Sequence, residues 1–309
     1  MEPILHIGYQ KTATTWLQKV VLKHHPELAL VLRSTKGADW LENSIGQHPF
    51  AFKPDRIRTA YSECIEPFLG RLPFVSHEAW IGDPYTGGRN TPENARRLHA
   101  IFPEARVVIV VREPIDMIKS MYRQYVQEGG ALDCDSLLTA RYPQRTYFDR
   151  NFLNYDEVLD LYVGLFGRDR VCALPYELVV DSPQQFLDDL LKFCGVSPLN
   201  LDDIKQRRKQ RPRNRGLSMP SLAVARRLNR ILGSAFNPTP LLPQRLATWR
   251  ELRHLLQRRV DPRLGSQSWN DSGNPLLSNE RVEQLESHYR PHNERLEREY
   301  GIAFPSKPG

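Results

Sequence analysis

The sequence predicts an α/β fold in which a central, mainly parallel sheet is flanked by helices in three layers, with a helical elaboration toward the C-terminus. Two stretches carry this prediction. Residues 4–7 form an apolar run of strand length that breaks at Gly8 and leads through a polar loop into an apolar-periodic helix. Residues 107–111 are all β-branched, which is typical of a strand buried on both faces of a parallel sheet, and Pro114 begins a helix soon after it.

The remaining elements follow from apolar spacing and from turn residues. Further strands are expected at residues 28–32, in the first half of 72–82 and at 171–174. Apolar residues at helical spacing, such as Ile57, Tyr61 and Ile65, predict a helix over 54–69. The same reasoning predicts helices at 91–102, within 148–166, and at 184–194, 218–232, 245–259 and 278–300.

Length and composition limit the class of protein. The 309 residues can bury a large core and fit one domain, 1–309, in which residues 205–277 form a basic loop and helical insertion that could act as a lid or bind an acceptor. No run of eighteen apolar residues encodes a membrane span, and the first strand begins too early to leave room for a signal peptide. The four cysteines are scattered. We therefore expect a cytoplasmic protein.

The net charge of +7 predicts a surface that attracts anions. The sequence contains no helix-turn-helix signature, zinc finger or RNA-binding aromatic motif, so we expect no nucleic-acid partner. It also offers no obvious cluster of metal ligands, and we expect no metal cofactor.

The loop after Gly8 is typical of an anion site. The backbone N–H groups at a helix N-terminus have no intrahelical partners and carry partial positive charge, and Lys11 adds a full charge. Thr12, Thr14 and Thr15 add hydroxyl donors. The loop fails the Walker A pattern G-x-x-x-x-G-K-[ST], because Gln10 precedes the lysine where that pattern has glycine.

A second anion site is expected after residues 107–111. Arg112 stands at the end of that strand, where its guanidinium could bind a phosphate through two parallel hydrogen bonds. Ser120 lies two helical turns into the helix that begins at Pro114 and could donate beside the arginine.

Both stretches resemble motifs of the sulfotransferase family. Residues 9–16, Y-Q-K-T-A-T-T-W, are similar to its 5'-phosphosulfate loop Y-P-K-S-G-T-T-W, with Gln10 in place of proline and Ala13 in place of glycine. The 3'-phosphate motif R-x-P-x-D-x-x-x-S-x-Y is matched at Arg112, Pro114, Asp116, Ser120 and Tyr122. The resemblance implies a P-loop-like fold and 3'-phosphoadenosine 5'-phosphosulfate (PAPS) as co-substrate.

The resemblance also implies the residues that would bind PAPS. Lys11, Thr12, Ala13, Thr14, Thr15 and Trp16 would hold its 5' end, and Arg112 and Ser120 its 3'-phosphate. Tyr176, in a segment similar to the family's Y-E-D, would contact the adenine. The basic segment 205–216 could close over the 3'-phosphate through Arg215 and Gly216, with Arg213 as the alternative to Arg215. A solvated surface is the competing interpretation of this segment.

His77 and Glu78 are the candidate bases. They follow the strand in residues 72–76, and ligands of open α/β sheets bind at the carboxyl ends of strands. Because successive strand side chains point to opposite faces, one of the two is expected to face the site. Sulfotransferases carry a histidine or glutamate base at about this point in the chain, and Glu78 is favoured slightly for a carbohydrate-type enzyme.

The function predicted from these features is transfer of the sulfuryl group of PAPS to an acceptor hydroxyl of a carbohydrate or glycan, by a carbohydrate-like sulfotransferase of bacterial type. Lys11 would stabilise the leaving phosphate, and no metal ion would be required. Two alternatives stay open. One is a P-loop kinase or NTPase that binds Mg-ATP, and the other is a non-catalytic module that binds anionic glycans through its basic segments.

Overall fold

The computed structural model describes residues 2–142, 145–146, 148–206, 219–234, 236 and 276–305. The chain divides into two compact units. The first comprises residues 1–113, 149–210 and 288–309, and the second comprises residues 114–148 and 211–287. The predicted segment 205–277 lies largely outside the described residues, as does the whole of the expected helix at 245–259.

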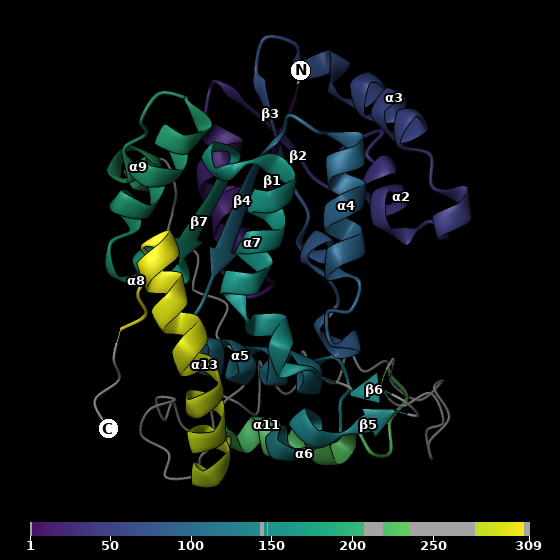
Figure 1. Ribbon diagram of the computed structural model, residues 1–309, viewed down its shortest axis with the longest axis vertical. Coiled ribbons are helices and arrows are strands. Elements are labelled where there is room, and N and C mark those ends of the chain that lie inside the picture. The colour runs from purple at the N-terminus through teal and green to yellow at the C-terminus, as the bar shows by residue number, and fades with distance from the viewer. Residues whose placement is uncertain are drawn as a thin grey trace. The chain divides into compact units, whose positions relative to one another are not determined.

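A five-stranded sheet forms the centre of the first unit (Figure 1). Its strands are all parallel, which confirms the predicted sheet. In the order β2-β3-β1-β4-β7 they are β2 (Leu28–Val31), β3 (Leu72–Ser76), β1 (Ile4–His6), β4 (Arg106–Val111) and β7 (Val171–Pro175). The chain runs from β1 to one side for β2 and β3 and then crosses to the other side for β4. Ligands of open α/β sheets bind beyond the carboxyl ends of the strands at such a point of reversal.

Helices cover both faces of this sheet, so the predicted three layers are confirmed within the unit. On one face Ile4, Phe74 and Val108 belong to an apolar cluster shared with α9 and with the helical segment after β1. On the opposite face α7 contacts β4 and β7 and also packs against α4 (Figure 1). The alternation of side chains along each strand explains why every residue from 107 to 111 in β4 is completely buried.

The helices of the first unit match most of the predicted ranges. The expected helix at 54–69 ends early because Pro67 lacks the N–H that would continue it, and a 3-10 turn, Glu66–Phe68, follows. Three of these helices, α2, α8 and α10, were not predicted. The set is α1 (Thr14–Trp16), α2 (Trp40–Gly46), α3 (Pro54–Ile65), α4 (Thr91–Ile101), α7 (Tyr155–Phe166), α8 (Tyr176–Asp181), α9 (Pro183–Cys194) and α10 (Leu201–Gln206).

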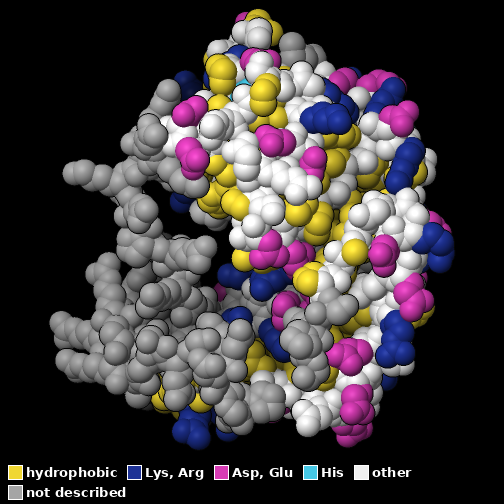
Figure 2. All heavy atoms as spheres, turned by 90° about the vertical axis from the view of Figure 1, so that its left-hand side faces the viewer, with side chains coloured by type: hydrophobic (Ala, Val, Ile, Leu, Met, Phe, Trp, Pro, Cys, Tyr) yellow, Lys and Arg dark blue, Asp and Glu magenta, His cyan; other side chains and the backbone are white. Residues whose placement is uncertain are grey.

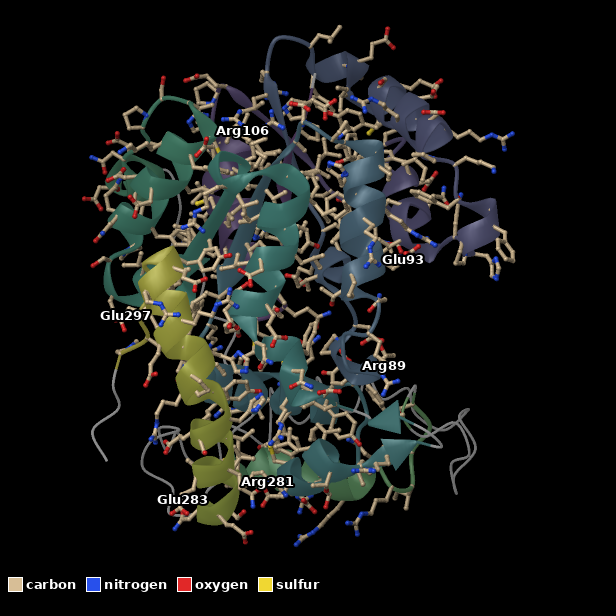
Figure 3. The ribbon with its side chains drawn as sticks, viewed as in Figure 1. Arg89, Glu93, Arg106, Arg281, Glu283 and Glu297 are labelled. Atoms are coloured by element: carbon tan, nitrogen blue, oxygen red, sulfur yellow. The ribbon has the colours of Figure 1, made fainter. Side chains whose placement is uncertain are left out.

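Arg106 ties the start of β4 to the end of α9. Its Nη1 donates to the carbonyl oxygens of Phe193 and Cys194, each at 2.9 Å, and Figure 3 labels this arginine beside the sheet. The last carbonyls of a helix lack intrahelical donors and carry partial negative charge, so a guanidinium there stabilises the helix end. Figure 2 shows acidic side chains scattered over the face of the molecule on which α8 and α9 lie.

The C-terminal helix α13 (Asn279–Tyr300) confirms the predicted helix at 278–300. Its later part belongs to the first unit, where it is held on α7 by a buried acidic residue. Asp156, with a side chain only 4% exposed, accepts from His292 Nδ1 at 2.9 Å and pairs with Arg295 at 3.4 Å. The Tyr289 hydroxyl donates to the Arg150 carbonyl oxygen at 2.9 Å.

The second unit is mainly helical in its described part. Asn229, just after α11, donates through Nδ2 to the carbonyl oxygens of Val126 and Gly130 at 2.8 and 2.7 Å, which ties α11 to the end of α5. Two short antiparallel strands also belong to this unit. Its elements are α5 (Pro114–Gln127), α6 (Cys134–Thr139), β5 (Arg141–Tyr142), β6 (Arg145–Thr146), α11 (Met219–Leu228) and the first part of α13.

Candidate active site

The loop between β1 and α1 adopts an uncommon backbone conformation. Lys11 and Ala13 have φ values of 68° and 61°, in the left-handed region that residues with a Cβ rarely occupy. Such strain persists only where surrounding contacts impose it. Tyr9 supplies these contacts, because its buried hydroxyl donates to the Phe152 carbonyl oxygen at 2.9 Å and its own carbonyl oxygen accepts from Thr12 Oγ1 at 2.5 Å. Left-handed turns of this kind form concave backbone sites that bind anions.

The three threonines of the loop have different environments. The Thr12 hydroxyl is used inside the loop, so the backbone N–H is the group that this residue could offer to a ligand. The Thr14 hydroxyl is buried and lies near the carboxyl group of Glu78. Thr15 is exposed. The ring of Trp16 packs against Phe186 of α9 at a centroid distance of 6.2 Å, which anchors α1 on the sheet.

The helix that follows the loop is not the regular α-helix that its apolar spacing predicts. After the single turn of α1, residues Leu17–Val21 form a π-helix and Leu22–His24 a 3-10 turn. π-helical turns are rare and occur frequently at functional sites. The apolar residues still face inward, since Leu17, Val21 and Leu22 are all at most 2% exposed.

Arg112 connects the two predicted anion motifs within the first unit. Its Nη1 donates to the Lys11 carbonyl oxygen at 3.4 Å, and its guanidinium lies over the Tyr176 ring at 4.6 Å from the ring centroid. Its own carbonyl oxygen accepts from the hydroxyl of Tyr155 at 2.7 Å. The expected 5' and 3' sites therefore meet at the carboxyl ends of β1 and β4, and Tyr176 lies beside them at the start of α8.

The other residues expected at the 3'-phosphate lie in the second unit or outside the described residues. Ser120 lies in α5 of the second unit, where it is 6% exposed. Arg213, Arg215 and Gly216 lie outside the described residues. Their assignment stays a prediction.

His77 and Glu78 both line a cleft of about 620 Å³ at the carboxyl end of β3. We call it the β3 cleft. Its walls come from Gln10, Thr15, Gln18 and Lys19, from residues 32–34 after β2, and from residues 76–79. The two side chains have different neighbours, Lys11 and Thr14 for Glu78 and Glu42 and Trp80 for His77, and which of them faces a bound acceptor stays a prediction. β3 ends at Ser76 and a 3-10 turn begins at Glu78, so strand alternation no longer applies there.

Burial changes the protonation of both candidate bases. It raises the pKa of Glu78, while the nearby Thr14 hydroxyl and the Lys11 ammonium act in the opposite direction. It lowers the pKa of His77, against the effect of Glu42, whose Oε1 is 3.7 Å from His77 Nε2. At neutral pH His77 is therefore the uncharged member of the pair. Glu78 is close enough to Lys11 for the charge of the ammonium group to lower its pKa.

Sequence reasoning missed a buried polar chain behind the cleft. Gln18 Nε2 donates to Ser76 Oγ at 2.9 Å, and Ser76 Oγ lies 2.8 Å from His6 Nδ1. Because complete burial lowers the pKa of His6 to about 4, this histidine is neutral and Nδ1 can accept from the serine hydroxyl. The chain fixes Gln18 at the wall of the cleft. No local signal in the sequence pairs residues this far apart.

The described residues contain no group of three or more histidine, cysteine, aspartate or glutamate side chains placed to hold a metal ion. Within the same part of the chain, no helix is both long enough and apolar enough to cross a membrane. All four cysteines are free.

Comparison with known proteins gives the family. The sequence profile of the sulfotransferase family matches residues 3–200. That range holds the Lys11 loop, both candidate bases and the Arg112 motif, and it exceeds half of the chain. The protein belongs to the sulfotransferase family. The predicted class of enzyme, a PAPS-dependent sulfotransferase, is confirmed by this match, and the class alone leaves the acceptor open.

Several solved sulfotransferase structures are similar to the chain at low identity. A sulfotransferase from Alicyclobacillus acidocaldarius is 19% identical, with a TM-score of 0.49 over 69% of this chain and 87% of that one. The sulfotransferase domain from the curacin biosynthetic pathway is 16% identical, with a TM-score of 0.45 over 94% and 98%. Mouse sulfotransferase SULT7A1, complexed with PAP, is 12% identical, with a TM-score of 0.41 over 97% and 85%. No significant match was found among curated protein sequences.

Proposed function

We propose that this protein transfers the sulfuryl group of PAPS to a hydroxyl group of a carbohydrate acceptor bound in the β3 cleft. The observation that carries the proposal is the convergence of three groups in the first unit. Arg112 donates to the carbonyl oxygen of Lys11, and the ammonium of Lys11 lowers the pKa of Glu78. A cation for each anionic end of the donor and a base for the acceptor therefore lie at one edge of the sheet.

The residues present fit PAPS, which supplies an activated sulfuryl group between two anionic ends. The left-handed backbone at Lys11 and Ala13 and the N-terminus of α1 would bind the 5' end. Arg112 would bind the 3'-phosphate, with Ser120 and Arg215 assigned to it from the motif. Arg112 covers one face of the Tyr176 ring, so an adenine stacked on that tyrosine would use the other face.

Lys11 and Glu78 would carry the chemistry. In sulfuryl transfer negative charge develops on the oxygen that bridges the sulfur and the leaving phosphate, and a lysine beside it stabilises that charge. Glu78, with its pKa raised by burial, would accept the proton of the acceptor hydroxyl, because a base works best when its pKa approaches the working pH. His77, neutral and next to it, is the alternative base.

The carbohydrate assignment is supported by the character of the β3 cleft. Of the side chains that line it, only those of Leu32 and Ala79 are apolar, and no phenyl, phenol or indole ring lines it among the described residues. A flat phenol or steroid would therefore find no such ring to stack on in this cleft. A sugar with several hydroxyl groups can instead hydrogen-bond with Gln10, Thr15 and Gln18.

Transfer of radiolabelled sulfuryl from PAPS to a panel of oligosaccharides tests the proposal, with Lys11→Ala and Lys23→Ala compared. Lys23 is an exposed lysine that does not line the cleft. We expect Lys11→Ala to lower kcat about 10²–10³-fold, the loss typical when one charge-stabilising donor is removed. Its melting temperature should stay within about a degree of the natural protein, and Lys23→Ala should keep full activity. Equal activity of all three proteins would contradict the role of Lys11.

A further inference from the structure

The β3 cleft carries more positive charge than a neutral sugar requires. Lys19, on the π-helical turn, and Arg33, after β2, both line it. Neither belongs to the motifs that bind the donor. Among the described residues that line the cleft Glu78 is the only acidic one, so the cations outnumber the carboxylates there.

The two cations are available to a ligand. Among the described residues Lys19 has no carboxylate within 4.0 Å. Arg33 pairs with Glu42 at 3.1 Å, but the two side chains are 77% and 47% exposed. An ion pair this exposed to solvent contributes little, at most about 1 kcal/mol, so the carboxylate of a ligand can take the place of Glu42. A guanidinium is also the cation best suited to bind a carboxylate through two hydrogen bonds.

We infer that the acceptor is an acidic carbohydrate, with a carboxylate on the sugar that lies next to the hydroxyl to be sulfated. Lys19 and Arg33 bind this carboxylate and so determine acceptor specificity, while Glu78 faces the hydroxyl. The inference rests on the proposed function, since it names the substrate class of the same cleft. Glu42 competes with the acceptor for Arg33 and reduces binding of the carboxylate.

The test compares two acceptors that differ only in charge. One is a short oligosaccharide of alternating glucuronate and N-acetylglucosamine, and the other is the same oligosaccharide with its carboxylates reduced to alcohols. We expect kcat/KM for sulfuryl transfer to be about tenfold or more higher with the acidic acceptor, the ratio that one charge-assisted contact gives. The ratio should fall as ionic strength rises, because exposed charges are screened.

Variants assign the preference to the two cations. In the double variant Lys19→Gln/Arg33→Gln the ratio should fall close to one, while the Kd for 3'-phosphoadenosine 5'-phosphate (PAP) stays the same. The matched control is Lys23→Gln/Arg56→Gln, which removes two exposed cations outside the cleft and should keep the ratio. Glu42→Gln should raise the ratio, because it releases Arg33.

Each outcome separates the inference from the proposed function. Equal transfer to both acceptors, or a double variant that weakens PAP binding while the ratio stays high, overturns the inference and leaves the sulfotransferase assignment in place. If the natural protein does not bind PAP, both the inference and the proposed function are overturned. If PAP binds and neither acceptor is sulfated, the two oligosaccharides are titrated into the PAP-loaded protein. Tighter binding of the acidic one supports the inference, and equal or absent binding refutes it.

Discussion

Tyr155→Phe tests whether the position of Arg112 depends on the hydrogen bond that its backbone carbonyl accepts from Tyr155. The Tyr155 ring is 1% exposed and packs edge-on against Tyr9 at a centroid distance of 5.1 Å. Its hydroxyl donates to the Arg112 carbonyl oxygen at 2.7 Å. The substitution keeps the ring and removes only this hydrogen bond, so it leaves one carbonyl group at the end of β4 without its donor.

The expected cost follows from that single group. A buried polar atom left unsatisfied costs about 1–3 kcal/mol in free energy of unfolding, which corresponds to a fall in melting temperature of roughly 2–4 °C per kcal/mol for domains of 150–250 residues. The same helix supplies a matched control. Tyr162 is also completely buried, but its hydroxyl has no hydrogen-bond partner among the described residues. Tyr162→Phe should therefore be neutral or slightly stabilising.

The assay combines thermal unfolding with a titration of PAP. Tyr155→Phe should lower the melting temperature and also raise the Kd for PAP, because it loosens the backbone that carries Arg112. Tyr162→Phe should neither lower the melting temperature nor raise the Kd for PAP. If the two variants lose equal stability and bind PAP equally well, Tyr155 is an ordinary core residue, and the argument that it positions Arg112 fails.

Two further substitutions test the strained and buried groups of the site. Glu78→Gln should raise the melting temperature at pH 8, because a carboxyl group whose pKa is raised on folding destabilises the protein wherever it must ionise. The gain in melting temperature should vanish below about pH 4, where the carboxyl group is protonated in both the folded and the unfolded state. The same substitution should lower the rate of sulfuryl transfer about 10²-fold or more. If the melting temperature at pH 8 does not rise, burial does not raise the pKa of Glu78. Ala13→Gly should raise the free energy of unfolding by about 1 kcal/mol, because glycine adopts the left-handed φ of 61° without a Cβ clash. Ala100→Gly in α4 should instead lower it by about 0.5–1 kcal/mol, and urea unfolding of both variants checks the opposite signs.

Local patterns in the sequence predicted the sheet and the two motif loops. The β-branched residues of β4 predict a strand that is buried on both faces of the sheet. The break at Gly8, followed by Lys11, predicts a strand, a loop and a helix in succession. These features depend on spacing within a few residues, which a single sequence displays directly. The family profile over residues 3–200 agrees with both loops.

The contacts that assemble the site depend on residues far apart in the chain, and these were not predictable. Arg33 reaches the β3 cleft because β2 lies beside β3, an order that no local signal specifies. Apolar spacing predicts a helix within 148–166 and nothing more for Tyr155, yet its hydroxyl donates to the Arg112 carbonyl oxygen. The alternation rule applies only within a strand, and β3 ends at Ser76, just before His77 and Glu78.

The most direct test of the central claim is a calorimetric titration of PAP in the presence of EDTA, comparing the natural protein with Lys11→Ala and Arg112→Ala. We expect micromolar or tighter binding without metal, about 8 kcal/mol in free energy, that weakens at least tenfold in Arg112→Ala. Lys23→Ala should bind like the natural protein. Absence of PAP binding by the natural protein, together with binding of Mg-ATP, would contradict the assignment of the Lys11 and Arg112 loops to the two ends of PAPS.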